Sequence, residues 1–414
     1  MFDHEAILSQ IRELYHGDNI PWVIGFSGGK DSTTVLQMLF YALSALPKHA
    51  LFKSIHVLCN DTLVENPAIV EYVDRQLEKI KTAGKTELFS HAPDLFSVVK
   101  VEPRLEDRFW VNLIGKGYPS PNRWFRWCTR RLKIKPTSDY ILSTVSEYGH
   151  AIIVLGTRKA ESANRAAAMK KYDNGQCLRK HTLPNAFVYA PIADLSNQEV
   201  WAYLLQAPNP WGSNNKELLK LYSNACDAGE CPFVIETGTQ SCGKSRFGCW
   251  VCTVVNRDIS MENFIDNGAE WMQKLLDFRN WIHDIRQQSN QGAPDSFRAK
   301  INFGPFLLKT RREMLDRLLR IQDSMPIELI GSDELHYVCE LIGRDSEQQI
   351  LEGLKEFVFE LPNGNRIATI SDFNIVLSQR SRLGGIYLKQ AKFIETRSVP
   401  FNYSNPTRIM YYLY

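Results

Sequence analysis

Short apolar runs alternate with amphipathic stretches over the first 170 residues. The apolar runs have the length and the Val and Ile content of buried strands, and each ends in a polar cluster. Helical spacing follows each of them. Strand, turn and helix in alternation predict an α/β fold with a doubly wound, mostly parallel sheet. The expected strands cover 20–26, 54–59 and 151–155, and the expected helices cover 31–46, 65–82 and a stretch that ends at 171.

The rest of the chain has a different pattern. The segment 109–135 is rich in Gly, Pro, Trp and Arg, and it predicts a long loop followed by the start of a helix. Cysteine and glycine dominate 227–256. Helices are then expected at 261–286, 311–321, 333–342 and 345–354, and strands at 356–361 and 366–370 around an Asn-Gly turn. These patterns predict an α/β domain at 1–205, a Cys-rich region at 206–290 and a mostly helical extension at 291–414.

Composition and charge narrow the possible classes of protein. Of the 414 residues, 44% are hydrophobic and 23% are charged, which is typical of a globular protein. The net charge of +3 argues against a histone-like polyanion binder but allows a local basic groove. No apolar run reaches the roughly 18 residues of a membrane helix, and residues 1–12 lack the apolar core of a signal peptide. The expected location is cytoplasmic, with no membrane partner.

The first polar cluster has the features of a phosphate-binding loop, because it follows a strand and opens a helix. Glycines let backbone N–H groups approach phosphate oxygens, and a helix N-terminus favours negative charge. A Walker A loop is excluded, since Asp31 rather than Ser or Thr follows Lys30. A carboxylate there suits a magnesium ion. The candidate nucleotide-binding residues are Ser27, Gly28, Gly29, Lys30, Asp31 and Ser32; the alternative is an ordinary Gly-rich turn.

Two further polar clusters are expected in the same crevice. Asp61 follows the second strand, and Gly156 and Arg158 follow the third. Ligands of doubly wound sheets bind beyond the carboxyl ends of the strands, so these residues should meet the phosphate loop. Asp61 has two equally good interpretations. It is either a ligand of magnesium or water, or a turn residue that caps the next helix.

Cys128 is surrounded in the sequence by cations. Nearby positive charge lowers the pKa of a thiol and makes it a better nucleophile, so Cys128 is a candidate catalytic residue. The alternative is a solvated basic face with one buried cysteine. The neighbouring cations are Arg126, Arg130, Arg131 and Lys133, and together with Arg158 and Arg165 they form a supply of phosphate ligands.

Five of the nine cysteines crowd into one Gly-containing segment. Four thiolates there fit either a tetrahedral zinc ion or a [4Fe–4S] cluster. Zinc sites more often have two close pairs of ligands, and only one close pair is present, so the uneven spacing favours iron–sulfur. The candidate ligands are Cys231, Cys242, Cys249 and Cys252, and Cys226 lies close enough in sequence to replace Cys231.

The loop at 27–32 resembles the PP-loop of ATP pyrophosphatases, a superfamily that includes tRNA-thiolating enzymes and phosphoadenylyl-sulfate reductases. The segments 125–136 and 156–165 resemble the reductase branch. The resemblance implies an adenine-nucleotide α-hydrolase-like fold and cleavage of ATP between the α and β phosphates, with Mg²⁺. It makes Lys30 and Asp31 candidate catalytic residues, and it makes 1–205 a PP-loop ATP pyrophosphatase domain.

A narrower resemblance is to the DndC/SspD family of DNA phosphorothioation proteins, strong over about 15–290 and weak beyond. Members work with a cysteine desulfurase, which supplies sulfur, and with the other proteins of the modification system. The resemblance implies replacement of a non-bridging phosphate oxygen of DNA by sulfur, and a [4Fe–4S] cluster on the four candidate cysteines. The motifs do not separate the two systems. They lie at 109–119, 125–135, 209–212, 230–232, 241–243 and 245–255.

The expected function is therefore thiolation of the DNA backbone. A DNA phosphate oxygen attacks the α-phosphorus of ATP, pyrophosphate leaves, and sulfur then displaces AMP. A phosphoadenylyl-sulfate reductase is an alternative, weakened because no cysteine follows Cys339. A tRNA-thiolating enzyme and a non-enzymatic iron–sulfur scaffold that binds nucleotide also stay open. DNA is expected along Lys116, Tyr118, Arg123, Trp124 and Arg126, with cations on phosphates and aromatic rings on bases.

Overall fold

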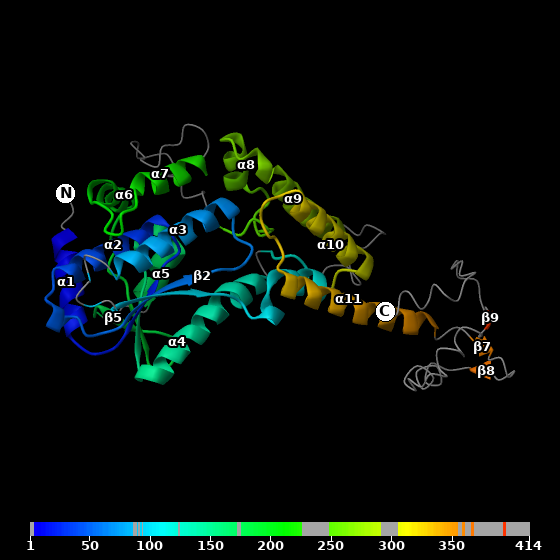
Figure 1. Ribbon diagram of the computed structural model, residues 1–414, viewed down its shortest axis with the longest axis horizontal. Coiled ribbons are helices and arrows are strands. Elements are labelled where there is room, and N and C mark those ends of the chain that lie inside the picture. Colours follow the sequence, from blue (N-terminus) through cyan, green and yellow to red (C-terminus); the bar gives the residue numbers. More distant parts are fainter. Residues whose placement is uncertain are drawn as a thin grey trace.

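A computed structural model describes residues 4–85, 89, 92, 94–122, 125–171, 175–225, 248–290, 305–354, 358–360, 366–367 and 392–394. Helices and strands alternate through the first half of these residues, and helices dominate the second half (Figure 1). The helices are α1 (His4–His16), α2 (Lys30–Ser44), α3 (Pro67–Ala83), α4 (Lys135–Tyr148), α5 (Ala163–Lys171), α6 (Asn197–Gln206), α7 (Asn215–Asn224), α8 (Ile259–Asp266), α9 (Gln273–Asn290), α10 (Leu308–Asp323) and α11 (Ser332–Leu354). The strands are β1 (Trp22–Gly25), β2 (Ile55–Asn60), β3 (Phe96–Val101), β4 (Ala151–Val154), β5 (Leu178–Lys180), β6 (Ala186–Tyr189), β7 (Val358–Glu360), β8 (Arg366–Ile367) and β9 (Lys392–Ile394).

The main sheet has six strands in the order β3-β2-β1-β4-β6-β5. All neighbouring pairs are parallel except β5 and β6, which are antiparallel. The chain runs outward from β1 through β2 to β3 and then returns to place β4 on the other side of β1. This reversal of strand order is the point at which doubly wound sheets bind ligands. The predicted fold class is confirmed.

Helices cover both faces of this sheet, because successive side chains of a strand point to opposite faces. Trp22 and Ile24 of β1 pack in a core with α1, α2, α3 and α6. Val23 faces the other way, toward Ile141 of α4. Figure 1 shows α4 on the side of the sheet opposite α2 and α3. With both faces buried, the central strands are apolar at nearly every position, as the sequence pattern predicted.

A second core lies outside the sheet. It joins the segment around Trp110 and Ile114 with Trp250 and with buried side chains of α9, α10 and α11. In Figure 1 these helices lie beside one end of the sheet, next to the end of α4. Segments on either side of the Cys-rich region therefore pack together. Among the described residues, no helix is long and apolar enough to cross a membrane.

The element boundaries differ from the sequence predictions in a few places. The helix expected at 261–286 is split into α8 and α9 at Gly268, whose φ of +102° ends the first helix. The two helices expected at 333–342 and 345–354 are the single helix α11, which continues through Gly343. The loop expected at 109–135 contains two wide helical turns, η3 (Val111–Gly115) and η4 (Thr129–Ile134). β7 and β8 form the predicted hairpin.

Candidate functional site

The phosphate loop joins β1 to α2 at the reversal of strand order. Gly29 is the N-terminal cap of α2, and Lys30 is its first residue. Gly28 has a φ of +71°, a conformation that L side chains rarely adopt. A Cβ on Gly28 would also lie 2.5 Å from Val73 Cγ2. Both conditions require glycine at Gly28.

Gly156 brings the end of β4 against the start of α2. A Cβ on Gly156 would lie 2.7 Å and 2.8 Å from the backbone C and O of Asp31, and 2.9 Å from the backbone N of Ser32. These are main-chain atoms of a helix N-terminus, so the contact has no flexible side chain to relieve it. Gly156 therefore permits the close approach of the end of β4 to the N-terminus of α2.

Asp31 links two cations at the loop. Its Oδ1 accepts from Arg158 Nε at 2.6 Å, and its Oδ2 pairs with Lys30 Nζ at 3.0 Å. Arg158 is only 2% exposed and also donates from Nη1 to the carbonyl of Leu195. Both carboxylate oxygens of Asp31 therefore hold cations in place. Each oxygen keeps a second lone pair, so these ion pairs leave Asp31 able to bind magnesium as well.

One cavity of about 920 Å³ runs beside the phosphate loop and holds most of the predicted site residues. Its lining also includes thiols from two segments that are far from the loop in sequence. Doubly wound topology and the second core together produce this convergence. The predicted residues that line the cavity are Ser27, Gly29, Lys30, Asp31, Ser32, Arg158, Cys128, Cys249 and Cys252.

The close pair of cysteines is fixed against the loop that follows β2. Backbone bonds run from Asn66 N–H to Gly248 O at 3.2 Å and from Trp250 N–H to Val64 O at 3.0 Å. Thr62 Oγ1 lies 3.4 Å from Cys249 Sγ. The N–H of Cys252 donates to the carbonyl of Cys249 at 3.1 Å, so both thiols sit on one turn.

A pair of cysteines on one turn, at the wall of a cavity, is the arrangement that a C-x₂-C ligand pair needs. Cys249 and Cys252 thus fit half of a four-thiolate centre. The other predicted ligands, Cys231 and Cys242, and the spare Cys226 lie outside the described residues. Among the described residues, no three His, Cys, Asp or Glu side chains are grouped closely enough to hold a metal ion.

Cys128 differs from its sequence prediction in its ionisation. Burial raises the pKa of the Cys128 thiol, and the charge of Cys252 adds to the increase. The arginines next to it do not reverse this, because Arg131 pairs with Asp107 and Arg130 is exposed. The prediction that these cations favour the thiolate is therefore wrong. Burial also raises the pKa of Cys249, to about 12, although the nearby Lys133 opposes the change.

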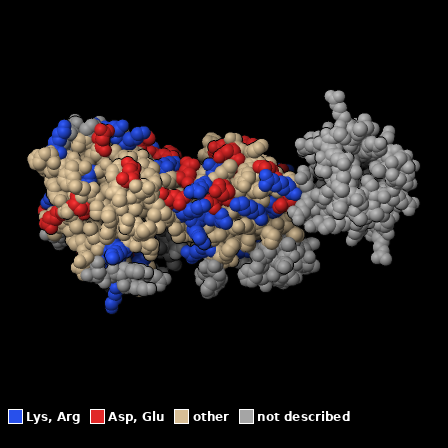
Figure 2. Space-filling view, turned by 90° about the horizontal axis from the view of Figure 1, so that it is seen from below, with Lys and Arg blue, Asp and Glu red and all other residues tan. Residues whose placement is uncertain are grey.

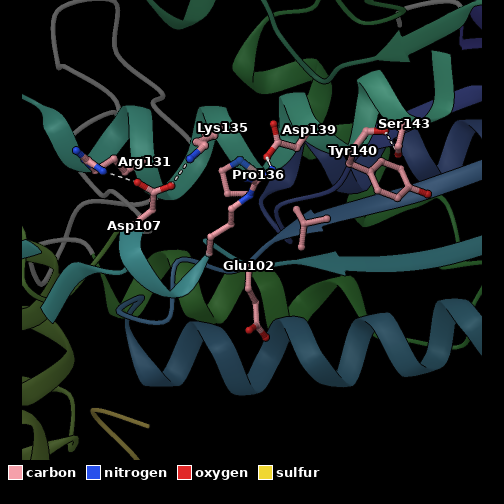
Figure 3. Close-up of a pocket in the computed structure, with 10 residues that line it drawn as sticks. Glu102, Asp107, Arg131, Lys135, Pro136, Asp139, Tyr140 and Ser143 are labelled. Carbon is pink, nitrogen blue, oxygen red and sulfur yellow. Dashed lines mark hydrogen bonds and ion pairs between the residues drawn. The ribbon is translucent and has the colours of Figure 1, made fainter. Parts of the chain in front are cut away.

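Asp107 anchors the segment that carries Cys128. It is 3% exposed, and its carboxylate forms ion pairs with both Arg131 and Lys135 (Figure 3). Burial alone would raise the pKa of Asp107, but the hydrogen bonds from Lys135 and Arg131 hold it below its usual value. These groups line a second, smaller cavity of about 340 Å³. The cations of this segment are thus partly committed to a buried carboxylate and are not all available to phosphate.

Asp61 is not brought into the cavity lining. Its Oδ1 accepts from the N–H of Leu63 at 2.8 Å, and its Oδ2 pairs with Lys100 at 2.8 Å. Asn66 rather than Asp61 caps α3. The turn after Asp61 puts Leu63 at a φ of +63°, a strained conformation for a branched side chain. Asp61 therefore holds the turn that presents Thr62 to Cys249.

Two features of the site have no signal in the sequence motifs. Tyr222 of α7 lines the cavity with its hydroxyl at the phosphate loop. Arg279 of α9 is fully buried and donates to the carbonyls of Cys252, Val255 and Asn256. Both residues lie on amphipathic helices whose sequences carry no motif of a binding site. Only the tertiary packing shows that they belong to the site.

The fold and the cavity define an α/β protein with a phosphate loop at the strand-order reversal and thiols at the same cavity. A family model, the phosphoadenosine phosphosulfate reductase domain, matches residues 21–255. The chain belongs to this family. An uncharacterized protein of Methanocaldococcus jannaschii is 27% identical over 242 residues, which are 58% of this chain and 38% of that protein. The chain thus spans well under two thirds of that relative.

Among the solved structures that resemble the chain are the following three. One is a phosphoadenylyl-sulfate reductase from Candida auris in a phosphate complex, with 12% identity over 53% of this chain and 85% of that one, at a TM-score of 0.31. Another is the FMN adenylyltransferase of Candida glabrata with FAD and inorganic pyrophosphate. It has 10% identity over 55% of this chain and 63% of that one, at a TM-score of 0.32. The third is the U34-tRNA thiolase NcsA of Methanococcus maripaludis with its [4Fe–4S] cluster. It has 13% identity over 68% of this chain and 80% of that one, at a TM-score of 0.30.

Proposed function

We propose that this protein is the ATP pyrophosphatase and sulfurtransferase of a DNA phosphorothioation system. The observation that carries the proposal is the single cavity lined by the phosphate loop, Cys128, Cys249 and Cys252. Activation and thiolation of one phosphate need a nucleotide and a sulfur nucleophile in the same place. At about 920 Å³ the cavity is near the upper end of small-molecule sites, which suits a nucleotide together with a substrate phosphate.

In the first step, the N–H groups of the loop and the cations Lys30 and Arg158 would bind the phosphates of ATP, with Mg²⁺ as counter-ion. A non-bridging oxygen of a DNA phosphate forms a bond to the α-phosphorus. The bond from the α-phosphorus to the bridging oxygen breaks, and pyrophosphate leaves with its electron pair. Asp31 keeps Lys30 and Arg158 in position through the ion pairs described above. Positioning and charge neutralisation account for the catalysis.

In the second step, a persulfide on Cys128, loaded by a cysteine desulfurase, would attack the adenylated DNA phosphorus, and AMP leaves. A second thiol then cleaves the S–S bond, which releases the thiophosphate with the electron pair and leaves a disulfide for an external thiol to reduce. Cys252 lies in the same cavity and influences Cys128 electrostatically, but as a proposed cluster ligand it is not this second thiol, which comes from an external reductant. When bound by Cys231, Cys242, Cys249 and Cys252, a [4Fe–4S] cluster would supply a redox-active centre beside this reaction.

DNA would approach along the exposed residues around 125–130. Arg126 lines the cavity, and Arg126 and Arg130 form no ion pair with any carboxylate among the described residues. Phe125 is 43% exposed, which suits stacking on a base. Trp127 is buried at 7% and is a core residue, and Arg123 and Trp124 lie outside the described residues. Figure 2 shows Lys and Arg side chains gathered near the middle of one face, among scattered acidic residues.

A phosphoadenylyl-sulfate reductase-like activity is the second candidate, because the family match covers 21–255. That reaction consumes a sulfonucleotide and a reductant, and it releases no pyrophosphate from ATP. A tRNA-thiolating enzyme would share the ATP step and differ in its nucleic acid. The three activities are therefore separated by their substrates and products.

The test uses the full chain purified without oxygen, with ATP, Mg²⁺, DNA, cysteine and a cysteine desulfurase. We expect pyrophosphate release and phosphorothioate in the DNA by mass spectrometry. Lys30→Ala and Asp31→Ala should lower pyrophosphate release about 10- to 150-fold, since one charge-assisted contact contributes on the order of 1.5–3 kcal/mol. Lys48→Ala, an exposed lysine outside the cavity, should not. Wild-type pyrophosphate release by Lys30→Ala, or thiolation of tRNA instead of DNA, would contradict the proposal.

A further inference from the structure

Tyr222 is an aromatic side chain that contacts the phosphate loop directly. Its hydroxyl oxygen accepts a hydrogen bond from the backbone N–H of Lys30 at 3.3 Å. It would lie 3.3 Å from a Cβ placed on Gly29. The ammonium of Lys30 lies 5.5 Å from the centre of the Tyr222 ring. Both the main chain and the side chain of Lys30 therefore meet Tyr222.

The position of the hydroxyl is set by packing on several sides. The Tyr222 ring makes an edge contact with Trp201 of α6, at 5.2 Å between ring centres. Three residues after it, the carbonyl of Ala225 accepts from Asn263 Nδ2 of α8 at 3.2 Å in a buried bond. Trp201 and Tyr222 both line the large cavity. A side chain held in this way can orient a ligand.

The N–H of Lys30 is one of the donors at the N-terminus of α2, where an anion binds most favourably. A phenol that accepts from such an N–H carries its own proton as a donor. Burial raises the pKa of Tyr222, so this proton stays on the oxygen at neutral pH. Chained hydrogen bonds of this kind strengthen one another in a site of low dielectric constant.

We propose that Tyr222 is a phosphate ligand of the nucleotide site. Its hydroxyl accepts a hydrogen bond from the Lys30 N–H and donates one to a phosphate oxygen. The proposal rests on the proposed function only in requiring that the loop binds a nucleotide. It assigns the last turn of α7, directly before the Cys-rich segment, to the phosphate-binding surface. The donors that reach phosphate at this point are then the Lys30 ammonium and the Tyr222 hydroxyl, while the Lys30 N–H donates to the Tyr222 oxygen.

Titration of the full-length chain with Mg²⁺-ATP, inorganic pyrophosphate and adenosine tests the role. Tyr222→Phe keeps the ring, and so the contacts with Trp201 and Lys30, and removes only the hydroxyl. We expect affinity for ATP and for pyrophosphate to fall about tenfold, the size expected of one lost hydrogen bond to a charged group. Affinity for adenosine, which has no phosphate, should not change. The matched control is Tyr41→Phe on α2, whose hydroxyl donates to the Pro208 carbonyl and does not line the cavity.

The outcomes separate the two proposals. Wild-type affinity of Tyr222→Phe for ATP and pyrophosphate would overturn the ligand role while leaving the nucleotide site in place. Tighter binding by this variant would also overturn it, because the hydroxyl would then compete with phosphate for the Lys30 N–H. An equal loss of adenosine affinity would assign Tyr222 to packing and overturn the role. A wild-type chain that binds neither ATP nor pyrophosphate would overturn both the inference and the proposed function.

Discussion

Asp31 and Cys128 show what single residues contribute beyond their sequence motifs. The sequence places Asp31 in a phosphate loop, but its partner Arg158 is 127 positions away and is found only through the sheet. Cys128 has arginines as sequence neighbours, yet burial determines its pKa. A side chain in a helical turn has its nearest contacts three or four residues away or on another element. Proximity in sequence was therefore a poor guide to the charge around Cys128.

The role of Cys128 in sulfur transfer is a prediction about a single residue that one substitution can test. Cys128→Ser should bind ATP and release pyrophosphate like the wild type, because Cys128 belongs to a different segment from the phosphate loop. It should retain bound iron and yield no phosphorothioate in cells that supply the other components. Mass spectrometry of DNA from these cells measures the product. Normal phosphorothioate would make Cys128 a packing residue, and loss of iron would make it a cluster ligand.

At the scale of elements, the sequence was informative where a single periodicity applied. The central strands β1, β2 and β4 are buried on both faces and were predicted from continuous apolar runs. β3 was missed because it lies at the edge of the sheet, where its side chains are mostly half-buried or exposed and the run is mixed. The sequence predicted that Gly156 would meet the phosphate loop, but not how closely its backbone approaches α2, since that distance depends on β1 and β4 being neighbours.

Gly156→Ala tests that contact between elements. The added Cβ would lie within 2.7–2.9 Å of the backbone of Asp31 and Ser32, so the N-terminus of α2 must shift. We expect a loss of stability on the order of 1–3 kcal/mol and weaker nucleotide binding. Gly343→Ala in α11 is the control, since its Cβ would meet no atom within 4 Å. Thermal unfolding and ATP titration measure both effects, and an unchanged Gly156→Ala would refute the close approach.

The N-terminus of α11 contacts η3 through a buried carboxyl group. Glu334 is 2% exposed and accepts from the N–H groups of Trp110 at 3.0 Å and Val111 at 3.4 Å. Burial raises the pKa of Glu334 from 4.5 to about 7, opposed by Arg108 and these N–H groups. The folded state thus binds the proton more tightly than the unfolded state. Stability from this group is therefore lost as the pH rises from about 4.5 to about 7.

Glu334→Gln removes this titration and keeps an oxygen acceptor for the two N–H groups. Relative to the wild type, the variant should gain free energy of unfolding as the pH is raised from 5 to 8. The full gain should be on the order of 2–4 kcal/mol. Urea unfolding at a series of pH values gives the difference directly. A difference that does not change with pH would mean that Glu334 is ionised in the folded protein throughout this range.

At the scale of the whole molecule, the two cores divide the site between them. The sheet core positions the phosphate loop, Gly156 and Arg158. The second core, which includes Trp127, Trp250 and the helices α9 to α11, positions the thiols. The sequence predicted the first core from its strands, placed the helix at 261–286 in the Cys-rich region and treated only the later helices as an extension. It gave no sign that α9 supports the close pair of cysteines, because the contact of Arg279 with the Cys252 carbonyl joins residues 27 positions apart on different elements.

This division predicts that the thiol end can be damaged without loss of the nucleotide end. Arg279→Met removes the donor to the carbonyls of Cys252, Val255 and Asn256, which stay buried without it. The cost in folding free energy should be on the order of 2–4 kcal/mol, concentrated on the turn that holds Cys252.

Wild-type protein purified without oxygen should contain iron and sulfide near four each per chain, as a [4Fe–4S] centre requires. Arg279→Met should lose most of this iron and still bind ATP with wild-type affinity, whereas Arg320→Met, at an exposed site on α10, should keep both. Iron content and ATP titration on the same samples decide the matter, since a joint loss of iron and ATP binding would show that the two cores support one indivisible site.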